Sequence, residues 1–93
     1  MSNKPIRVLL VDDHAIARNG VRLMLSTDEG IVVTGEAGNA IEALQLVGQQ
    51  EFDVALCDIT MPGKNGLDLL KQLRADKPKL AVLMLSKIGR AHV

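Results

Sequence analysis

The feature that most limits the possible fold of this sequence is a carboxylate placed directly after an apolar run. Asp58 follows the apolar residues 54–57, and a Met61-Pro62-Gly63 segment comes shortly after it. Strands buried on both faces read as continuous apolar runs, and Asp is disfavoured inside them. Asp58 is therefore expected at the carboxyl end of a strand, where open α/β sheets bind ligands, with a turn following at Pro62 and Gly63. Taken alone, the stretch fits equally well an acidic strand end without a function.

A second apolar run, residues 8–11, ends in the acidic pair Asp12 and Asp13. If both runs are strands of one parallel sheet, three carboxylates meet at one edge and repel each other. A hard divalent cation removes this conflict, because magnesium prefers oxygen ligands and typically takes one or two carboxylates plus a phosphate. The alternative is that Asp12 and Asp13 are an N-cap and a dipole-complementing acid for the helix that follows.

The order of these motifs resembles a known family, the receiver domain of two-component response regulators. The resemblance rests on VLLVDDH at 8–14, DITMP at 58–62 with Gly66 after it, and VLMLS at 82–86. The sequence AIARNG at 15–20, after the Asp-Asp-His motif, is similar to the branch with LuxR-type (NarL-like) DNA-binding output domains. The resemblance covers residues 6–86 in order.

The resemblance implies a site and a fold. Asp58 would be the phosphoacceptor, and Mg²⁺ would be held by Asp13, Asp58 and the backbone carbonyl of Thr60, with Asp12 assisting. Ser86 would be the hydroxyl that responds to the phosphoryl group; its alternative role is a strand-end hydroxyl bonded to the local backbone. The fold would be α/β and flavodoxin-like (CheY-like), a three-layer sandwich with a parallel sheet in the order 2-1-3-4, truncated after the fourth strand (βαβαβαβ).

Periodicity supports alternating strands and helices, and hence a parallel sheet. Strands are expected at residues 6–11, 31–34, 53–57 and 80–85, and helices from Ala15 to about residue 27 or 28, after Asn39, and from Asn65 or Gly66 to Lys77. The first helix should bury the apolar set Ala17, Val21, Met24 and Leu25. Asn39 and Glu42 are expected to form a variant of the capping box.

Several single residues have simple expected roles. Arg18 and Arg22, four residues apart, are expected to be solvated helix charges. Phe52, the single aromatic residue, is expected to fill the core, and Cys57 to be a small buried side chain. Gly20 costs helix stability and is expected to mark close packing against the sheet.

Composition limits the class of protein. The chain has 93 residues and a formal net charge of zero, so it is one domain at most and has no overall field that would draw it to nucleic acid or membrane. A single cysteine argues against a disulfide framework. The sequence has neither a secretory signal nor an apolar run long enough to span a membrane. A cytoplasmic location without membrane contact is therefore expected.

Two departures from the family pattern affect the domain assignment. A full receiver has a further strand with an invariant lysine that contacts the phosphoryl group, and Lys87 does not replace it because it adjoins Ser86 at a strand end. Residues 88–93, IGRAHV, resemble nothing in the family and match the translation of a common sequencing adapter. Residues 1–87 are thus expected to be the N-terminal part of a receiver domain, and 88–93 a non-native tail from adapter read-through.

The expected function is that of a phosphoacceptor rather than an enzyme. The donor would be a phosphohistidine on a sensor histidine kinase, and DNA would be contacted only through an output domain absent from this chain, with a possible homodimer on phosphorylation. One alternative is a receiver-like interaction module that is never phosphorylated. Another is a magnesium-dependent phosphatase of the haloacid dehalogenase type, but that family needs a second Asp at the position of Thr60.

Overall fold

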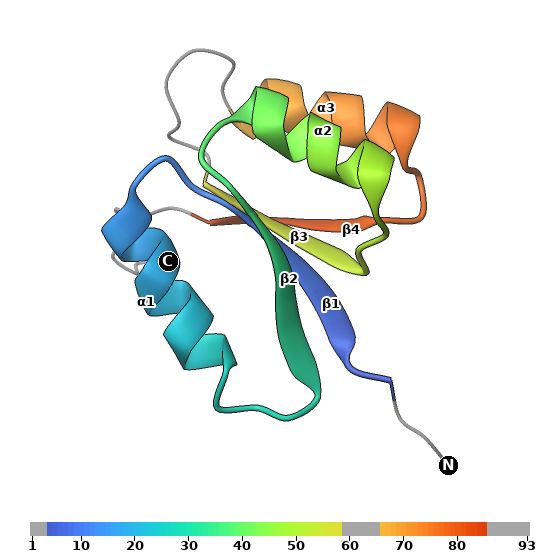
Figure 1. Cartoon of the computed structure of the whole chain (residues 1–93). Coiled ribbons are helices and arrows are strands. Elements are labelled where there is room, and N and C mark those ends of the chain that lie inside the picture. The colour runs from blue at the N-terminus through green and yellow to red at the C-terminus, as the bar shows by residue number, and fades with distance from the viewer. Residues whose placement is uncertain (1–3, 59–65, 86–93) are drawn as a thin grey trace.

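The computed structural model of the chain describes residues 4–58 and 66–85, and these form a parallel sheet with helices on both faces (Figure 1). The elements in chain order are β1 (Ile6–Val11), α1 (Ala15–Leu25), β2 (Ile31–Ala37), α2 (Ala40–Gln49), β3 (Val54–Asp58), α3 (Gly66–Asp76) and β4 (Ala81–Leu85). The strand order is β2-β1-β3-β4, and every pairing is parallel. The three-layer α/β fold and the 2-1-3-4 order expected from the resemblance are confirmed for these strands.

The helices divide between the two faces of the sheet. α2 and α3 lie side by side on one face, and α1 lies on the other (Figure 1). The main core fills the α2/α3 side and consists of Leu9, Val11, Ala37, Ala40, Ala43, Val47, Phe52, Ala55, Cys57, Leu69 and Leu73. The strand residues of this core alternate with residues that face α1, as the period of two in a strand requires. Phe52 and Cys57 are buried as expected.

β2 runs three residues further than expected, because Gly35 continues the strand instead of ending it. The register between β1 and β2 shifts after Val8, so that Thr34 is passed over and Leu9 pairs with Gly35. A Cβ atom at position 35 would lie 2.7 Å from Cζ of Phe52, closer than real contacts allow. Glycine at this position therefore makes room for the aromatic side chain that fills the core.

α1 packs against the sheet less closely than expected. It ends at Leu25, two or three residues early, and none of its residues is fully buried. Met24 is 69% exposed, so its assignment to the buried face was wrong, whereas Ala17, Val21 and Leu25 are half-buried at a spacing of four residues. The expectation for Gly20 was also wrong, because a Cβ atom built there would meet no atom within 4 Å.

α2 is capped by Asn39, whose side-chain oxygen accepts a hydrogen bond of 2.8 Å from the backbone N–H of Glu42. The carboxylate of Glu42 accepts from the backbone N–H of Gly38 at 2.7 Å, one residue before the cap, so the reciprocal bond of the capping box is displaced. α3 ends before Lys77-Pro78, as expected. Its expected cap, Asn65, and the Met61-Pro62-Gly63 turn lie outside the described residues.

Candidate functional site

Three carboxylates gather at the carboxyl edge of the sheet, and we call Asp12, Asp13 and Asp58 the acidic cluster. β1 and β3 are adjacent, with Val11 paired to Cys57, so the residues that follow these positions emerge side by side. One ligand atom from each of Asp12, Asp13, Asp58 and His14 lies within 4.8 Å of the others. This is also the point where the strand order switches, since β2 lies on one side of β1 and β3 on the other.

Asp58 is the most enclosed member of the cluster. It is the last residue of β3 and is 2% exposed, the single buried charged side chain among the described residues. Cys57 precedes it and points to the opposite face, into the core, where burial raises the pKa of the thiol to about 12. Cys57 is therefore protonated and unreactive at neutral pH, and Asp58 is the group at this strand end that can act chemically.

The loop between β1 and α1 holds the other two acids at the rim. Oδ1 of Asp12 accepts a 2.9 Å hydrogen bond from the backbone N–H of His14, and the backbone N–H of Asp12 donates to the carbonyl of Ala37 at 3.0 Å. The side chains of Asp12 and Asp13 are 14% and 25% exposed. The N-cap residue of α1 is His14, and the first turn contains no acid. The alternative in which these aspartates cap the helix is therefore not supported.

The geometry fits a small divalent cation. In an octahedral magnesium site the ligand oxygens lie about 2.1 Å from the ion, so opposite ligands are separated by about 4.2 Å. The acidic cluster spans a similar distance, and its donors are carboxylate oxygens, the type that magnesium prefers. Asp12 and Asp58 also line a cavity of about 10 Å³, but its other lining residues are Arg18 and apolar side chains, so this cavity is not the cation site.

His14 is a neighbour of the cluster that was not among the predicted site residues. Its Nδ1 lies 3.1 Å from Oδ1 of Asp13, and its side chain is 66% exposed. The sequence does contain one indication that His14 lies near the cluster, because it directly follows Asp13. Two other predicted site residues, Thr60 and Ser86, lie outside the described residues, so their roles stay predictions.

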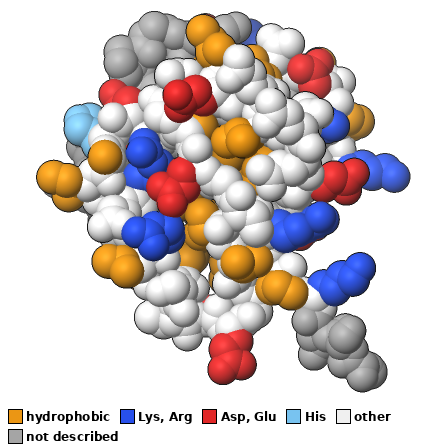
Figure 2. Space-filling model, in the orientation of Figure 1, with side chains coloured by type: hydrophobic (Ala, Val, Ile, Leu, Met, Phe, Trp, Pro, Cys, Tyr) orange, Lys and Arg blue, Asp and Glu red, His pale blue; other side chains and the backbone are white. Residues whose placement is uncertain are grey.

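Arg18 and Arg22 were expected to be solvated, but both bind Glu36 on β2. Nε of Arg18 lies 3.0 Å from Oε1 of Glu36, and Nε of Arg22 lies 3.2 Å from Oε2. Figure 2 shows this group as basic side chains on both sides of an acidic one, over the contact between α1 and β2. Nη1 of Arg18 also donates to the backbone carbonyl of Asp12 at 2.5 Å. The two arginines therefore fasten α1 to the sheet beside the acidic cluster.

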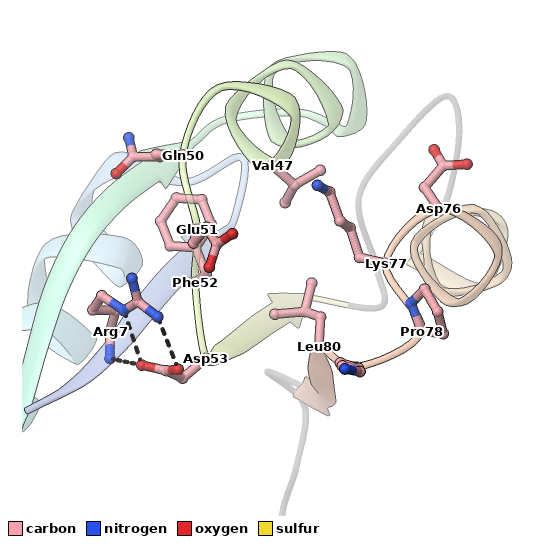
Figure 3. Close-up of a pocket in the computed structure, with 11 residues that line it drawn as sticks. Arg7, Val47, Gln50, Glu51, Phe52, Asp53, Asp76, Lys77, Pro78 and Leu80 are labelled. Carbon is pink, nitrogen blue, oxygen red and sulfur yellow. Dashed lines mark hydrogen bonds and ion pairs between the residues drawn. The ribbon is translucent and has the colours of Figure 1, made fainter.

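The opposite end of the sheet has a larger pocket of about 490 Å³, between the ends of α2 and α3 (Figure 3). Its floor includes Phe52 and Leu80, and at one side Arg7 holds Asp53 through two side-chain contacts of 3.1 Å. The backbone N–H of Arg7 also donates to Asp53, and these bonds lower the pKa of the Asp53 carboxyl to about 2. This ion pair joins the amino ends of β1 and β3, a structural role far from the acidic cluster.

A parallel α/β domain with an acidic cluster at the carboxyl edge of its central strands is thus the class that fold and site define. The model of the family named response regulator receiver domain matches residues 8–92. The chain belongs to this family. The match favours the receiver interpretation over the haloacid dehalogenase alternative.

Two curated relatives and one solved structure illustrate the similarity. The nitrate/nitrite response regulator protein NarP of Escherichia coli is 40% identical over 82 residues, which are 88% of this chain and 38% of NarP. A protein-glutamate methylesterase/protein-glutamine glutaminase of Myxococcus xanthus is 41% identical over 91% of this chain and 24% of that protein. RcsB from Salmonella enterica serovar Typhimurium, bound to a promoter in the presence of the phosphomimetic BeF₃⁻, superposes with a TM-score of 0.83 at 27% identity, over 89% of this chain and 43% of RcsB.

The chain therefore spans less than half the length of each of these proteins. Within residues 4–58 and 66–85, no helix has the length and apolar character needed to cross a membrane.

Proposed function

We propose that Asp58 is the phosphoacceptor of a two-component phosphorelay. The observation that carries this proposal is the burial of one carboxylate at a strand end with Asp12 and Asp13 beside it. A carboxylate is a competent nucleophile in phosphoryl transfer, and the protein contributes mainly positioning and charge neutralisation. Asp58 is the last residue of β3, and Asp12 directly follows β1, so pairing of these two strands holds Asp58 in place and fixes where the loop with Asp12 and Asp13 begins.

In the proposed reaction, an oxygen of Asp58 attacks the phosphorus of a phosphohistidine on a sensor histidine kinase. The oxygen–phosphorus bond forms as the phosphorus–nitrogen bond breaks, and the electron pair stays with the imidazole of the kinase. Asp12, Asp13, Asp58 and the carbonyl of Thr60 would hold Mg²⁺, which supplies charge neutralisation at the phosphoryl oxygens. After the transfer, the hydroxyl of Ser86 would form a hydrogen bond with the phosphoryl group on Asp58.

The product of this step is a signal rather than a released metabolite, so the domain is proposed to act as a switch and not as an enzyme. The receiver match to NarP and to a promoter-bound RcsB supports an output through a DNA-binding domain, with phosphorylation shifting a conformational equilibrium. Such a relay would operate in the cytoplasm, and dimerisation on phosphorylation belongs to the same proposal.

The first prediction tests Asp58. Incubated with acetyl phosphate and Mg²⁺, the protein should gain one phosphoryl group that hydroxylamine removes, as mass spectrometry can detect. Asp58→Asn should abolish the labelling, whereas Asp76→Asn, an exposed change at the end of α3, should leave it intact. An equal adduct on Asp58→Asn would refute the assignment. Magnesium binding without labelling of the wild type would favour the alternative, an interaction module that is not phosphorylated.

The second prediction tests the metal site by measuring the affinity for Mg²⁺. Asp13→Ala removes a proposed ligand and should weaken Mg²⁺ binding at least about tenfold, since even outer partners of metal ligands typically matter that much. Asp76→Ala should change the affinity less than twofold because it lies outside the cluster. Equal effects of the two changes would contradict the proposed ligand set.

A further inference from the structure

Arg18 on α1 contacts the acidic cluster in addition to forming an ion pair with β2. Its Nη1 donates to the backbone carbonyl of Asp12 at 2.5 Å, while its Nε binds Glu36 at 3.0 Å. The side chain is 21% exposed, about half the value for Arg22. Together with Asp12 and Asp58, Arg18 also lines the same small cavity. The guanidinium therefore connects β2, α1 and the loop that holds two of the three acids.

We infer that Arg18 is a positioning residue for the acidic cluster, which fixes the Asp12–Asp13 peptide so that both carboxylates point to the position of the metal. This inference rests on the proposed function and adds a residue to it. The peptide between Asp12 and Asp13 is planar, so holding the Asp12 carbonyl also fixes where the chain enters Asp13. Hydrogen bonds from a charged donor are about twice as strong as neutral ones, which suits such an anchor.

The other groups of Asp12 are already engaged, so Arg18 completes the restraint. The backbone N–H of Asp12 donates to Ala37 on β2, and its Oδ1 accepts from the backbone N–H of His14. Neither of these two bonds involves the carbonyl of the Asp12–Asp13 peptide, which Arg18 holds directly. Glu36 in turn holds Arg18, because its Oε1 binds this arginine while its Oε2 binds Arg22.

Arg22 is a natural control for this inference. It has the same side chain, lies one turn further along α1 and binds the same Glu36, but it reaches Asn19 instead of the Asp12 carbonyl. Arg18→Ala and Arg22→Ala thus each remove one cation and one contact to Glu36. The two variants differ in the hydrogen bond to Asp12.

A positioning role and a purely electrostatic role predict opposite changes in Mg²⁺ affinity when Arg18 is replaced. The positive charge of Arg18 repels an incoming Mg²⁺, so on Coulomb grounds alone its removal should strengthen metal binding. If Arg18 positions the acids, its removal should weaken binding, by on the order of tenfold as for other outer partners of metal ligands. Arg18→Lys keeps the charge but loses the planar fork that reaches both partners, so it should also weaken binding, to a smaller extent.

The experiment compares the wild-type chain with Arg18→Ala, Arg18→Lys and Arg22→Ala by amide hydrogen exchange without metal and by Mg²⁺ titration followed by NMR. In Arg18→Ala, exchange at the Asp13 and His14 amides should rise about tenfold or more over Arg22→Ala, consistent with the loss of a charged hydrogen bond. The Mg²⁺ dissociation constant should rise in Arg18→Ala and Arg18→Lys, and change less than twofold in Arg22→Ala.

Equal exchange in Arg18→Ala and Arg22→Ala, or tighter Mg²⁺ binding by Arg18→Ala, would overturn the inference. If Arg18→Ala does not fold, Arg18→Lys provides the same comparison, and wild-type exchange and affinity in that variant would overturn it. Failure of the proposed function is distinguishable, because it would appear in the wild-type chain itself, as no labelling by acetyl phosphate or no binding of Mg²⁺. The exchange measurement would then still decide whether Arg18 holds the loop.

Discussion

At the scale of single residues, the surroundings of each carboxylate decide what it can do. Asp58 is buried beside two other acids, whereas Asp53, the residue just before the same strand, has a side chain that is 42% exposed and bound to Arg7. The arginine lowers the pKa of Asp53 because its hydrogen bonds favour the ionised carboxylate. Asp53 therefore has a structural role, joining β1 and β3. The acidic cluster lies at the opposite end of the sheet.

The Arg7–Asp53 pair predicts a pH dependence of stability. The pKa of Asp53 is about 2 in the folded chain and 3.8 in an unperturbed carboxyl, so the pair stabilises the fold above about pH 4 and loses this effect as the pH falls towards 2. Urea unfolding of the wild type and Asp53→Asn should therefore differ at pH 5 and converge near pH 2. Arg7→Gln removes the side-chain bonds but keeps the backbone N–H that donates to Asp53, so its profile should lie between those of the wild type and Asp53→Asn. A wild-type profile in either variant would contradict the prediction.

The sequence was sufficient to predict that the three acids lie together at one edge of the sheet, but not that the arginines lie beside them. Asp12, Asp13 and Asp58 each follow an apolar run, and strand ends in a parallel sheet share one edge, so local pattern carries the information. Arg18 meets Glu36 across 18 positions of sequence, and this pairing follows only from how α1 lies on β2. A charge spaced four residues from another on a helix looks the same whether it is solvated or bound to a strand.

At the scale of elements, three of the four strands were predicted to within one residue at each end. β1 agrees with the predicted bounds, β3 differs by one residue at each end, and β4 begins one residue later than predicted, because each has a continuous apolar run. β2 was predicted to end before Gly35, since glycine usually interrupts a strand. It continues because Phe52 occupies the space beside Gly35, a contact between residues that are distant in sequence.

Two glycines should respond to alanine substitution in opposite directions. Gly20 lies inside α1 with open space around it, so Gly20→Ala should raise the free energy of unfolding by about 0.5–1 kcal/mol, the gain in helix propensity. Gly35→Ala would place a methyl group 2.7 Å from the Phe52 ring and should destabilise by about 1–3 kcal/mol, the usual cost of overpacking. Chemical denaturation measures both, and effects of the same sign would contradict the packing described for Gly20 and Gly35.

At the scale of the whole molecule, the two faces of the sheet are covered unequally. On the α2/α3 face the helices extend across the sheet, and Leu69 and Leu73 are fully buried. On the other face, α1 packs against β1 and β2. Leu83 and Leu85, which lie next to Leu56 and Asp58 in register, are 55% and 40% exposed on that face. The sequence pattern predicted the strands and the family resemblance implied their order, but exposure depends on which helix covers each strand.

Because Leu83 and Leu85 are exposed, we predict that the chain associates with itself through β4. Among the described residues β4 forms one edge of the sheet, and apolar edge strands template pairing with other chains unless a charge blocks them. Leu83→Lys should therefore lower both the binding of a hydrophobic dye and the association seen by sedimentation velocity. It should change the free energy of unfolding by no more than about 0.5 kcal/mol, the usual range for surface substitutions away from special features.

Ile41→Lys is the matched control, since Ile41 is 66% exposed on α2 and the change introduces the same charge at a position far from the β4 edge. If general charge governs solubility, the two variants should behave alike, because each raises the net charge of a formally neutral chain by one. If the β4 edge governs it, Leu83→Lys alone should shift the sedimentation profile towards monomer. Equal shifts in the two variants would locate the association elsewhere on the molecule.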